Sequence, residues 1–228
     1  MQKYLLSLLV LLISSSFTLF AQSKNLAEFT SISTSGSVQV ELVKGSSPKA
    51  EYTILKGNDE DLIIDVKNGE LIVKIKSKHS MWNRSETKAK VTVYYTSLKA
   101  IDCSAGSSLK SESEINEKDM NIESSSGANC SILLKSEDVN VSASSGAKIS
   151  INGTSNTAIY DASSGSRIDA ANLLTSNADA DVSSGASISL HATKKLKADA
   201  SSGGSIKYKG KPESTNIDSG MSGSIRSY

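Results

Sequence analysis

The chain has 228 residues, of which 25 are Lys or Arg and 24 are Asp or Glu, so its formal net charge at pH 7 is +1. This balance argues against a nucleic-acid-binding protein, because binding to the negatively charged phosphates requires a clear excess of basic residues. Aromatic residues make up only 5% of the chain, and there are two prolines. The core of a single domain must therefore be built mostly from aliphatic side chains.

Residues 1–21 predict a secretory signal peptide. One base, Lys3, precedes an uncharged apolar run that extends to Phe20, and Ala21 supplies a small residue at the cleavage point. The alternative is a membrane anchor, but the run falls short of the roughly 20 apolar residues that span a bilayer, and serines at 14–16 interrupt it. We therefore expect an exported chain that is not an integral membrane protein once processed.

Residues 22–100 are β-rich but less regular than the rest, and we expect them to be the first part of the same domain. The stretch LIIDVKNGELIVKIK holds two alternating runs joined by Asn68-Gly69, which is a strong hairpin signal. The acidic residues 59–61 predict a single helical turn, and KAKVTVYY predicts a further strand. Residues 77–87 have no periodicity and contain the sole Trp82, so we expect an exposed loop there.

Residues 101–228 contain an internal repeat of about twenty residues. The copies are centred on Ser-Ser-Gly or a close variant, with glycines at 106, 127, 146, 165, 185 and 203 and a decayed last copy. Five residues before the glycine stand Ile101, Ile122, Val141, Tyr160, Ala180, Ala198 and, in the last copy, Ile217. Three residues after it stand Leu109, Cys130, Ile149, Ile168, Ile188, Ile206 and Ile225. Further apolar positions follow at intervals of two, which is typical of strands with one buried face.

These columns predict two short strands per repeat, joined by a bend at Ser-Ser-Gly. Repeats of this length cannot bury their apolar face alone and must stack on their neighbours. Strands that recur in the same direction pair in parallel, so we predict an all-β solenoid with rungs about 4.8 Å apart. Glycine occupies the bend because it accepts unusual backbone angles, and the serines beside it can satisfy backbone groups there.

The motifs, in this order, resemble the family called putative auto-transporter adhesin, head GIN domain. The resemblance covers nearly the whole mature chain. It lies in FTSISTSGSVQVELVKG, the NGELIVKIK hairpin, the KVTVYYTSLKAIDCSAGS transition and the SSGA corners at 126–128, 145–147 and 184–186. The family implies a single-stranded, right-handed parallel β-helix on the cell-envelope side of a Gram-negative bacterium, and adhesion as its role. It supplies no catalytic residues.

Outward carboxylates are the nearest approach to a functional site. Four residues before the glycine stand Asp102, Glu123, Ser142, Asp161, Asp181, Asp199 and Asp218, with Asp179, Lys197 and Asn216 beside them. Like charges at rung spacing repel, so the row must be tolerated by solvent, relieved by neighbours or bridged by a cation. A solvated face is the simplest interpretation. The candidates for a Ca²⁺ site or a glycan-binding face are Asp161, Asp179, Asp181 and Asp199, and no other cofactor is expected.

We therefore expect a non-catalytic, exported binding or structural module of the cell envelope with an adhesin-like, Ser/Asp-rich face. Its partner would be an envelope protein or a glycan, and its location the periplasm, the outer-membrane surface or the extracellular space. His79 and His191 have no visible acid–base partner, so no catalytic residue is predicted. The alternative is a carbohydrate-active enzyme on the same scaffold, a polysaccharide lyase or hydrolase, which would use Asp161, Asp181 and Asp199.

Two further questions concern the cysteines and the end of the solenoid. Cys103 precedes one bend and Cys130 follows the next, in successive rungs but on different strands, so we expect buried free thiols rather than a disulfide. The apolar columns continue to Ile217 and Ile225, which leaves the C-terminal end without an obvious cap. This predicts either a weak homo-oligomer through that end or a packed tail.

Overall fold

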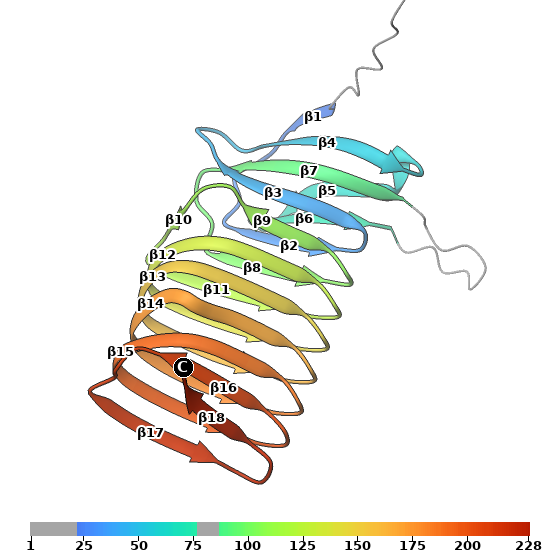
Figure 1. Ribbon diagram of the computed structural model, residues 1–228. Helices are drawn as coiled ribbons and strands as arrows, with labels where there is room; N and C mark the ends of the chain where they lie inside the picture. The colour runs from blue at the N-terminus through green and yellow to red at the C-terminus, as the bar shows by residue number, and fades with distance from the viewer. Residues whose placement is uncertain (1–21, 77–86) are drawn as a thin grey trace, which may run out of the picture.

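The computed structural model describes residues 22–76 and 87–228, which form a stack of β-strands (Figure 1). The less regular part contains β1 (Gln22–Asn25), β2 (Ser31–Ser35), β3 (Val38–Lys44), β4 (Lys49–Lys56), β5 (Leu62–Lys67), β6 (Glu70–Ile75) and β7 (Lys88–Tyr95). The regular part contains β8 (Ala100–Ser104), β9 (Ser108–Ser111), β10 (Ile115–Asn116), β11 (Asp119–Ser124), β12 (Asn129–Ala143), β13 (Lys148–Ala162), β14 (Arg167–Val182), β15 (Ser187–Ala200), β16 (Ser205–Lys209), β17 (Ser214–Ser219) and β18 (Ser224–Ser227). The predicted signal peptide, His79 and Trp82 lie outside the described residues.

The stack is a parallel β-solenoid of about 7 turns with two facing layers (Figure 1). We call the layer that precedes each Ser-Ser-Gly turn the leading sheet. It runs β5-β6-β2-β8-β11, continues through the later halves of β12 to β15, and ends at β17. The layer that follows each turn is the trailing sheet, which runs β1-β4-β7-β3-β9, continues through the earlier halves of β12 to β15, and ends at β16 and β18.

The predicted columns lie in register from rung to rung. In the leading sheet Ile122 pairs with Ile101 and Val141, and in the trailing sheet Ile168 pairs with Ile149 and Ile188. Their side chains point inward and fill the space between the two layers, so the repeat is buried as expected. At the C-terminal end the apolar columns are left without a cap among the described residues, as the sequence indicated. Ile217 is 43% exposed and Ile225 only partly buried, because no further rung covers them.

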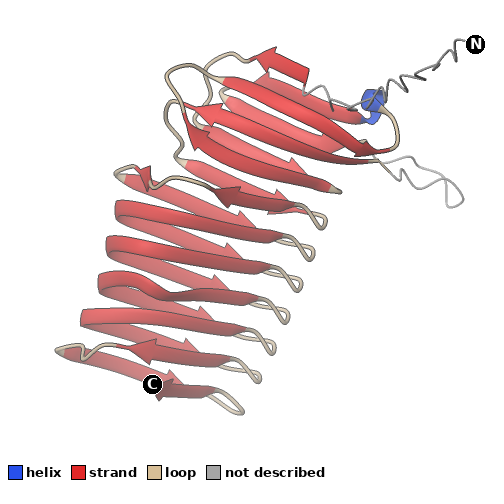
Figure 2. Ribbon diagram, turned by 45° about the horizontal axis from the view of Figure 1, so that its top comes forward, coloured by secondary structure: helices blue, strands red, loops and turns tan. Residues whose placement is uncertain are grey.

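The prediction of two short strands per rung is confirmed at both ends of the regular part, by β8, β9, β11 and β16 to β18, but was wrong for the rungs between them. Strands β12 to β15 contain 14 to 16 residues each and run from the trailing sheet of one rung into the leading sheet of the next. Figure 2 shows the turns aligned along one edge, while strands curve around the opposite edge without a break. At that edge Gly153 has a φ of +123°, and a Cβ there would lie 1.9 Å from the carbonyl oxygen of Leu134. Only glycine fits this close approach between rungs.

Each Ser-Ser-Gly turn uses two residues with positive φ, not the glycine alone. Ser145 has a φ of 50° and Gly146 a φ of 72°, and the N–H of Ala147 donates to the carbonyl of Ser144 at 3.0 Å. These are the features of a type I′ turn. The N–H of Gly146 also donates to the carbonyl of Ser164 in the next rung at 3.1 Å. The same contacts link the turns from Gly106 to Ser202, so the turns form a hydrogen-bonded ladder of their own.

A buried column that the sequence analysis missed follows the turn glycine directly. Its members are Ser107, Ala128, Ala147, Ser166, Ala186 and Gly204. The column is restricted to small residues because it lies at the narrow edge of the core, where a Cβ on Gly204 would come within 2.6 Å of the Val182 carbonyl oxygen. Where serine occurs, its hydroxyl is bonded: Ser166 Oγ donates to the carbonyl of Ala143 at 2.8 Å.

The less regular part continues both sheets. The hairpin of β5 and β6 forms around Asn68-Gly69, as predicted, and residues 59–61 form one 3₁₀ turn. Strand β2 lies between β6 and β8, and β3 lies between β7 and β9, all in parallel. Strands β1 and β4 then extend the trailing sheet in antiparallel pairing. Over residues 22–76 and 87–228, no helix has the length and apolar character needed to cross a membrane.

Candidate functional site

The outward carboxylates of the leading sheet form a straight row, which we call the acidic column. Its members are Asp102, Glu123, Ser142, Asp161, Asp181, Asp199 and Asp218, each paired with the next across neighbouring strands. They alternate along each strand with the buried core residues, so they face outward as predicted. All are exposed except Asp199, which is half-buried.

Two of the four candidate carboxylates are held by a lysine. Lys197 Nζ lies 3.2 Å from both carboxylate oxygens of Asp179 and 3.6 Å from Asp199 Oδ2. The hydrogen bond with Asp179 is the main reason that the pKa of Lys197 is raised, and Asp199 adds to it. In this part of the leading sheet a neighbouring base relieves the repulsion.

The other two candidates, Asp161 and Asp181, are not paired with a lysine in the described residues. In residues 22–76 and 87–228 neither makes an ion pair, and no three His, Cys, Asp or Glu side chains converge closely enough to hold a metal ion. Asp161, Asp181 and Asp199 thus lie in a line along the solenoid with Asp179 beside it, and the four do not close around a common point. A row of this kind can make repeated contacts with an extended ligand, one contact per rung.

A shallow depression lies at the N-terminal end of the acidic column. It has a volume of about 150 Å³ and is lined by Asp102, Glu123, Ser142 and Asp161 together with serines of the turns. This is smaller than the roughly 300 Å³ at the lower limit of ordinary ligand pockets. Loss of hydration beside the neighbouring strands, with repulsion from Glu123 and Glu70, raises the pKa of Asp102, although the residue remains exposed. The depression suits a small polar group and not an enclosed substrate.

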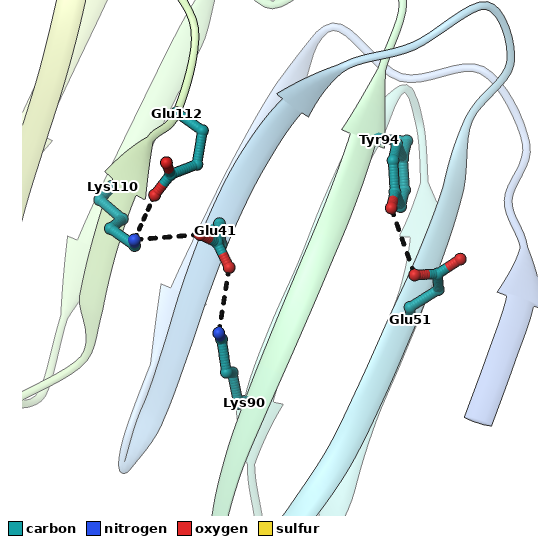
Figure 3. Close-up of polar contacts among 6 residues, drawn as sticks. All are labelled: Glu41, Glu51, Lys90, Tyr94, Lys110 and Glu112. Carbon is teal, nitrogen blue, oxygen red and sulfur yellow. Dashed lines mark hydrogen bonds and ion pairs between the residues drawn. The ribbon is translucent and has the colours of Figure 1, made fainter. Parts of the chain in front are cut away.

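A second polar cluster, on the trailing sheet, joins Glu41, Lys90, Lys110 and Glu112 (Figure 3). Glu41 Oε1 lies 3.0 Å from Lys110 Nζ, and its Oε2 lies 3.2 Å from Lys90 Nζ. Lys110 also pairs with Glu112. The hydrogen bond from Lys110 above all, with that from Lys90, lowers the pKa of Glu41 to about 2. A depression of about 350 Å³ lies over Glu41, Lys90 and Lys110.

The sequence analysis did not find this cluster, because its members come from three strands whose order in the sheet is not written in the repeat. Glu41 stands on β3, which lies between β7 with Lys90 and β9 with Lys110. Alternation did place Glu41 outward, between the buried Val40 and Leu42. On the adjacent strands Tyr94 Oη donates to Glu51 at 3.2 Å (Figure 3). The charges of this cluster are thus satisfied within it.

His191 stands alone as the one histidine of the described residues. Its side chain is half-buried on β15, between β14 and β16 of the trailing sheet, and makes no hydrogen bond or ion pair within the part of the chain that the structure describes. The thiols of Cys103 and Cys130 are buried and free, as expected. Interaction with the Cys103 thiol, together with burial, raises the pKa of the Cys130 thiol.

This architecture is similar to that of known proteins. A family model described as putative auto-transporter adhesin, head GIN domain, matches residues 28–212. No curated protein matches the chain. A putative adhesin from Bacteroides fragilis NCTC 9343 superposes with a TM-score of 0.82 at 22% identity, over 93% of this chain and 98% of that one.

Two further solved structures share the fold. A putative adhesin from Parabacteroides merdae ATCC 43184 has a TM-score of 0.71 at 18% identity, over 92% of this chain and 95% of that one. A protein described as a putative lipid binding protein, from Parabacteroides distasonis ATCC 8503, has a TM-score of 0.72 at 22% identity, over 92% of this chain and 96% of that one. At these identities the likeness establishes the fold alone.

Proposed function

The chain belongs to the putative auto-transporter adhesin, head GIN domain family, and from this we propose that it is a non-catalytic, exported binding module of the cell envelope. The observation that carries the proposal is the form of the acidic column. Its carboxylates repeat at about 4.8 Å along a flat, exposed sheet. A repeated row offers one weak contact per rung to an extended partner, and such contacts gain strength together.

The same geometry argues against acid–base catalysis by Asp161, Asp181 and Asp199. Such chemistry needs two groups placed in different environments, so that one is protonated while the other is not. Asp161 and Asp181 instead occupy equivalent, exposed positions on successive rungs, and Asp199, on the next rung, is paired with Lys197. We take the partner to be a glycan or an envelope protein, and the location to be the periplasm, the outer-membrane surface or the extracellular space. The predicted signal peptide in residues 1–21 supports export.

The test compares binding of the processed chain with that of a variant in which Asp161→Ser and Asp181→Ser are combined. Serine already stands at position 142 of the same column, so the fold accepts it there. Binding to a glycan array and to whole cells should fall about tenfold or more, because two adjacent contacts are lost. The matched control, Asp169→Ser, makes the same chemical change on the trailing sheet and should leave binding unchanged.

Two results would contradict the proposal. Equal binding by the wild-type chain, the double variant and the control would remove the acidic column from the function. Release of reducing or unsaturated sugar from acidic polysaccharides, abolished by Asp181→Ala, would establish an enzyme instead.

A further inference from the structure

The two outward faces of the solenoid carry opposite charge. On the leading sheet the acidic column is accompanied by a single base in the adjacent outward positions, Lys197. On the trailing sheet the outward positions two and four residues after the turn glycines hold Lys110, Lys148, Arg167, Lys207 and Arg226, and Asp169 is the one acid among them. Lys110 is paired with Glu41 and Glu112, so the separation of charge lies in the rungs that follow it, with acids on the leading sheet and bases on the trailing sheet.

On both faces like charges stand directly opposite one another on neighbouring strands. Lys148 is paired with Arg167 in the trailing sheet, and Asp161 is paired with Asp181 in the leading sheet. Within residues 22–76 and 87–228 none of these four side chains makes an ion pair. Like charges directly opposite one another destabilise a sheet. A partner of the opposite charge would relieve both stacks.

We propose that copies of this chain associate side by side, with the leading sheet of one copy against the trailing sheet of the next. The two faces match in charge, and they match in spacing because both follow the same rung repeat of about 4.8 Å. The contact joins two different surfaces, so each pair of copies leaves one face of each kind free, and association continues into a row. The inference needs no ligand and so does not rest on the proposed function.

The size of the faces fixes how strong the contact is. Each face is about 7 turns long, with the turns about 4.8 Å apart, and four or five residues of each strand make up its width. These dimensions give each face an area of about 500 Å² per copy. The total of about 1,000 Å² lies at the low end of specific interfaces. An association of this kind is weak and depends on electrostatic attraction that salt screens within about 10 Å at 0.1 M. Such an association forms more readily between copies crowded on a surface than between copies in dilute solution.

The experiment is sedimentation velocity on the processed chain over a range of concentrations, at about 20 mM and about 500 mM salt. At low salt we expect the weight-average sedimentation coefficient to rise with concentration. At high salt it should stay at the monomer value. A monomer at every concentration in low salt would overturn the proposal.

Two double variants identify the faces. Asp161→Ser with Asp181→Ser removes the two unpaired, stacked carboxylates from the leading sheet, and Lys148→Ser with Arg167→Ser removes the two stacked bases from the trailing sheet. Serine occurs in both columns, so each variant should fold. Each variant alone should stay monomeric at low salt. An equimolar mixture should form a dimer that does not grow, because only one pair of unaltered faces remains, and this dimer also shows that both variants are folded.

A third variant separates this arrangement from association through the exposed C-terminal end. Ile217→Lys places a charge on the uncovered end of the core without touching either charged face. We expect it to associate like the wild-type chain. Association that is lost in Ile217→Lys but kept in both double variants would overturn the proposal in favour of end-to-end contact.

Discussion

The hydroxyl of Tyr160 lies in the core with no hydrogen-bond partner among the described residues. Tyr160 stands in the leading sheet between Val141 and Ala180, is 1% exposed, and has its pKa raised by burial. A hydroxyl that leaves water without gaining a new bond costs about 1–3 kcal/mol. Tyr160→Phe removes the hydroxyl and keeps the ring, so it should increase the free energy of unfolding by about 1–2 kcal/mol.

The assay is urea denaturation followed by circular dichroism, with the slope of the transition compared between variants because solenoids can unfold in steps. In a thermal melt the same gain corresponds to a rise of about 2–4 °C for each kcal/mol in a chain of this size. Tyr94→Phe is the matched control. It removes a hydroxyl that donates to Glu51, so it should lower stability by about 1 kcal/mol. A loss of stability in Tyr160→Phe would refute the reasoning, since it would mean that the hydroxyl is bonded in the native protein.

Three other measurements test the glycine positions, the trailing-sheet cluster and the thiols. Gly153→Ala would force a methyl group to 1.9 Å from a backbone oxygen, so urea denaturation should show that the free energy of unfolding falls by about 3 kcal/mol or more. Gly165→Ala has open space around its methyl group and should lose only about 1 kcal/mol because of its positive φ. Equal losses in the two variants would contradict this. The pKa of Glu41 falls from 4.5 to about 2 on folding, so its contribution, about 1 kcal/mol after solvent screening, is present above pH 4.5 and is lost as pH falls through about 2. Glu41→Gln should flatten that part of the stability curve, and an unchanged acid slope would disprove the assignment. The thiols of Cys103 and Cys130 should react with iodoacetamide only on unfolding, and the intact mass should not change with reductant; an oxidised mass lower by two hydrogens would reveal a disulfide.

The regular rungs could be predicted from the sequence because each turn glycine marks the register of its rung. Counting from glycine was enough to align Ile149, Ile168 and Ile188, which pair across three strands as predicted. The continuous strands could not be predicted, because the alternation of inward and outward residues breaks at the curved edge, at residues 135–138 of β12 and 193–195 of β15, as it would at a loop between two strands. The sharp approach at Gly153 is visible only once Leu134 is placed above it.

The candidate site was predictable to the same extent. The acidic column follows directly from the repeat, since its members are equivalent residues of successive copies. The contact of Lys197 with Asp179 and Asp199 depends on side-chain direction, which the repeat does not specify. The cluster around Glu41 depends on β3 lying between β7 and β9, although β7 is separated from β3 in the chain by a hairpin and a further strand. Such strand order is a property of the whole fold.

The ladder of turns bears on how the protein would carry a load. Each turn is bonded to its immediate neighbour, as Gly146 is to Ser164, and no bond along that edge spans more than one rung. Tension applied at Tyr228 would therefore peel β18 and then the rungs above it one at a time, each releasing about 70 Å of slack for its roughly twenty residues. A protein built in this way yields in small, repeatable increments and dissipates a pull before the whole molecule fails.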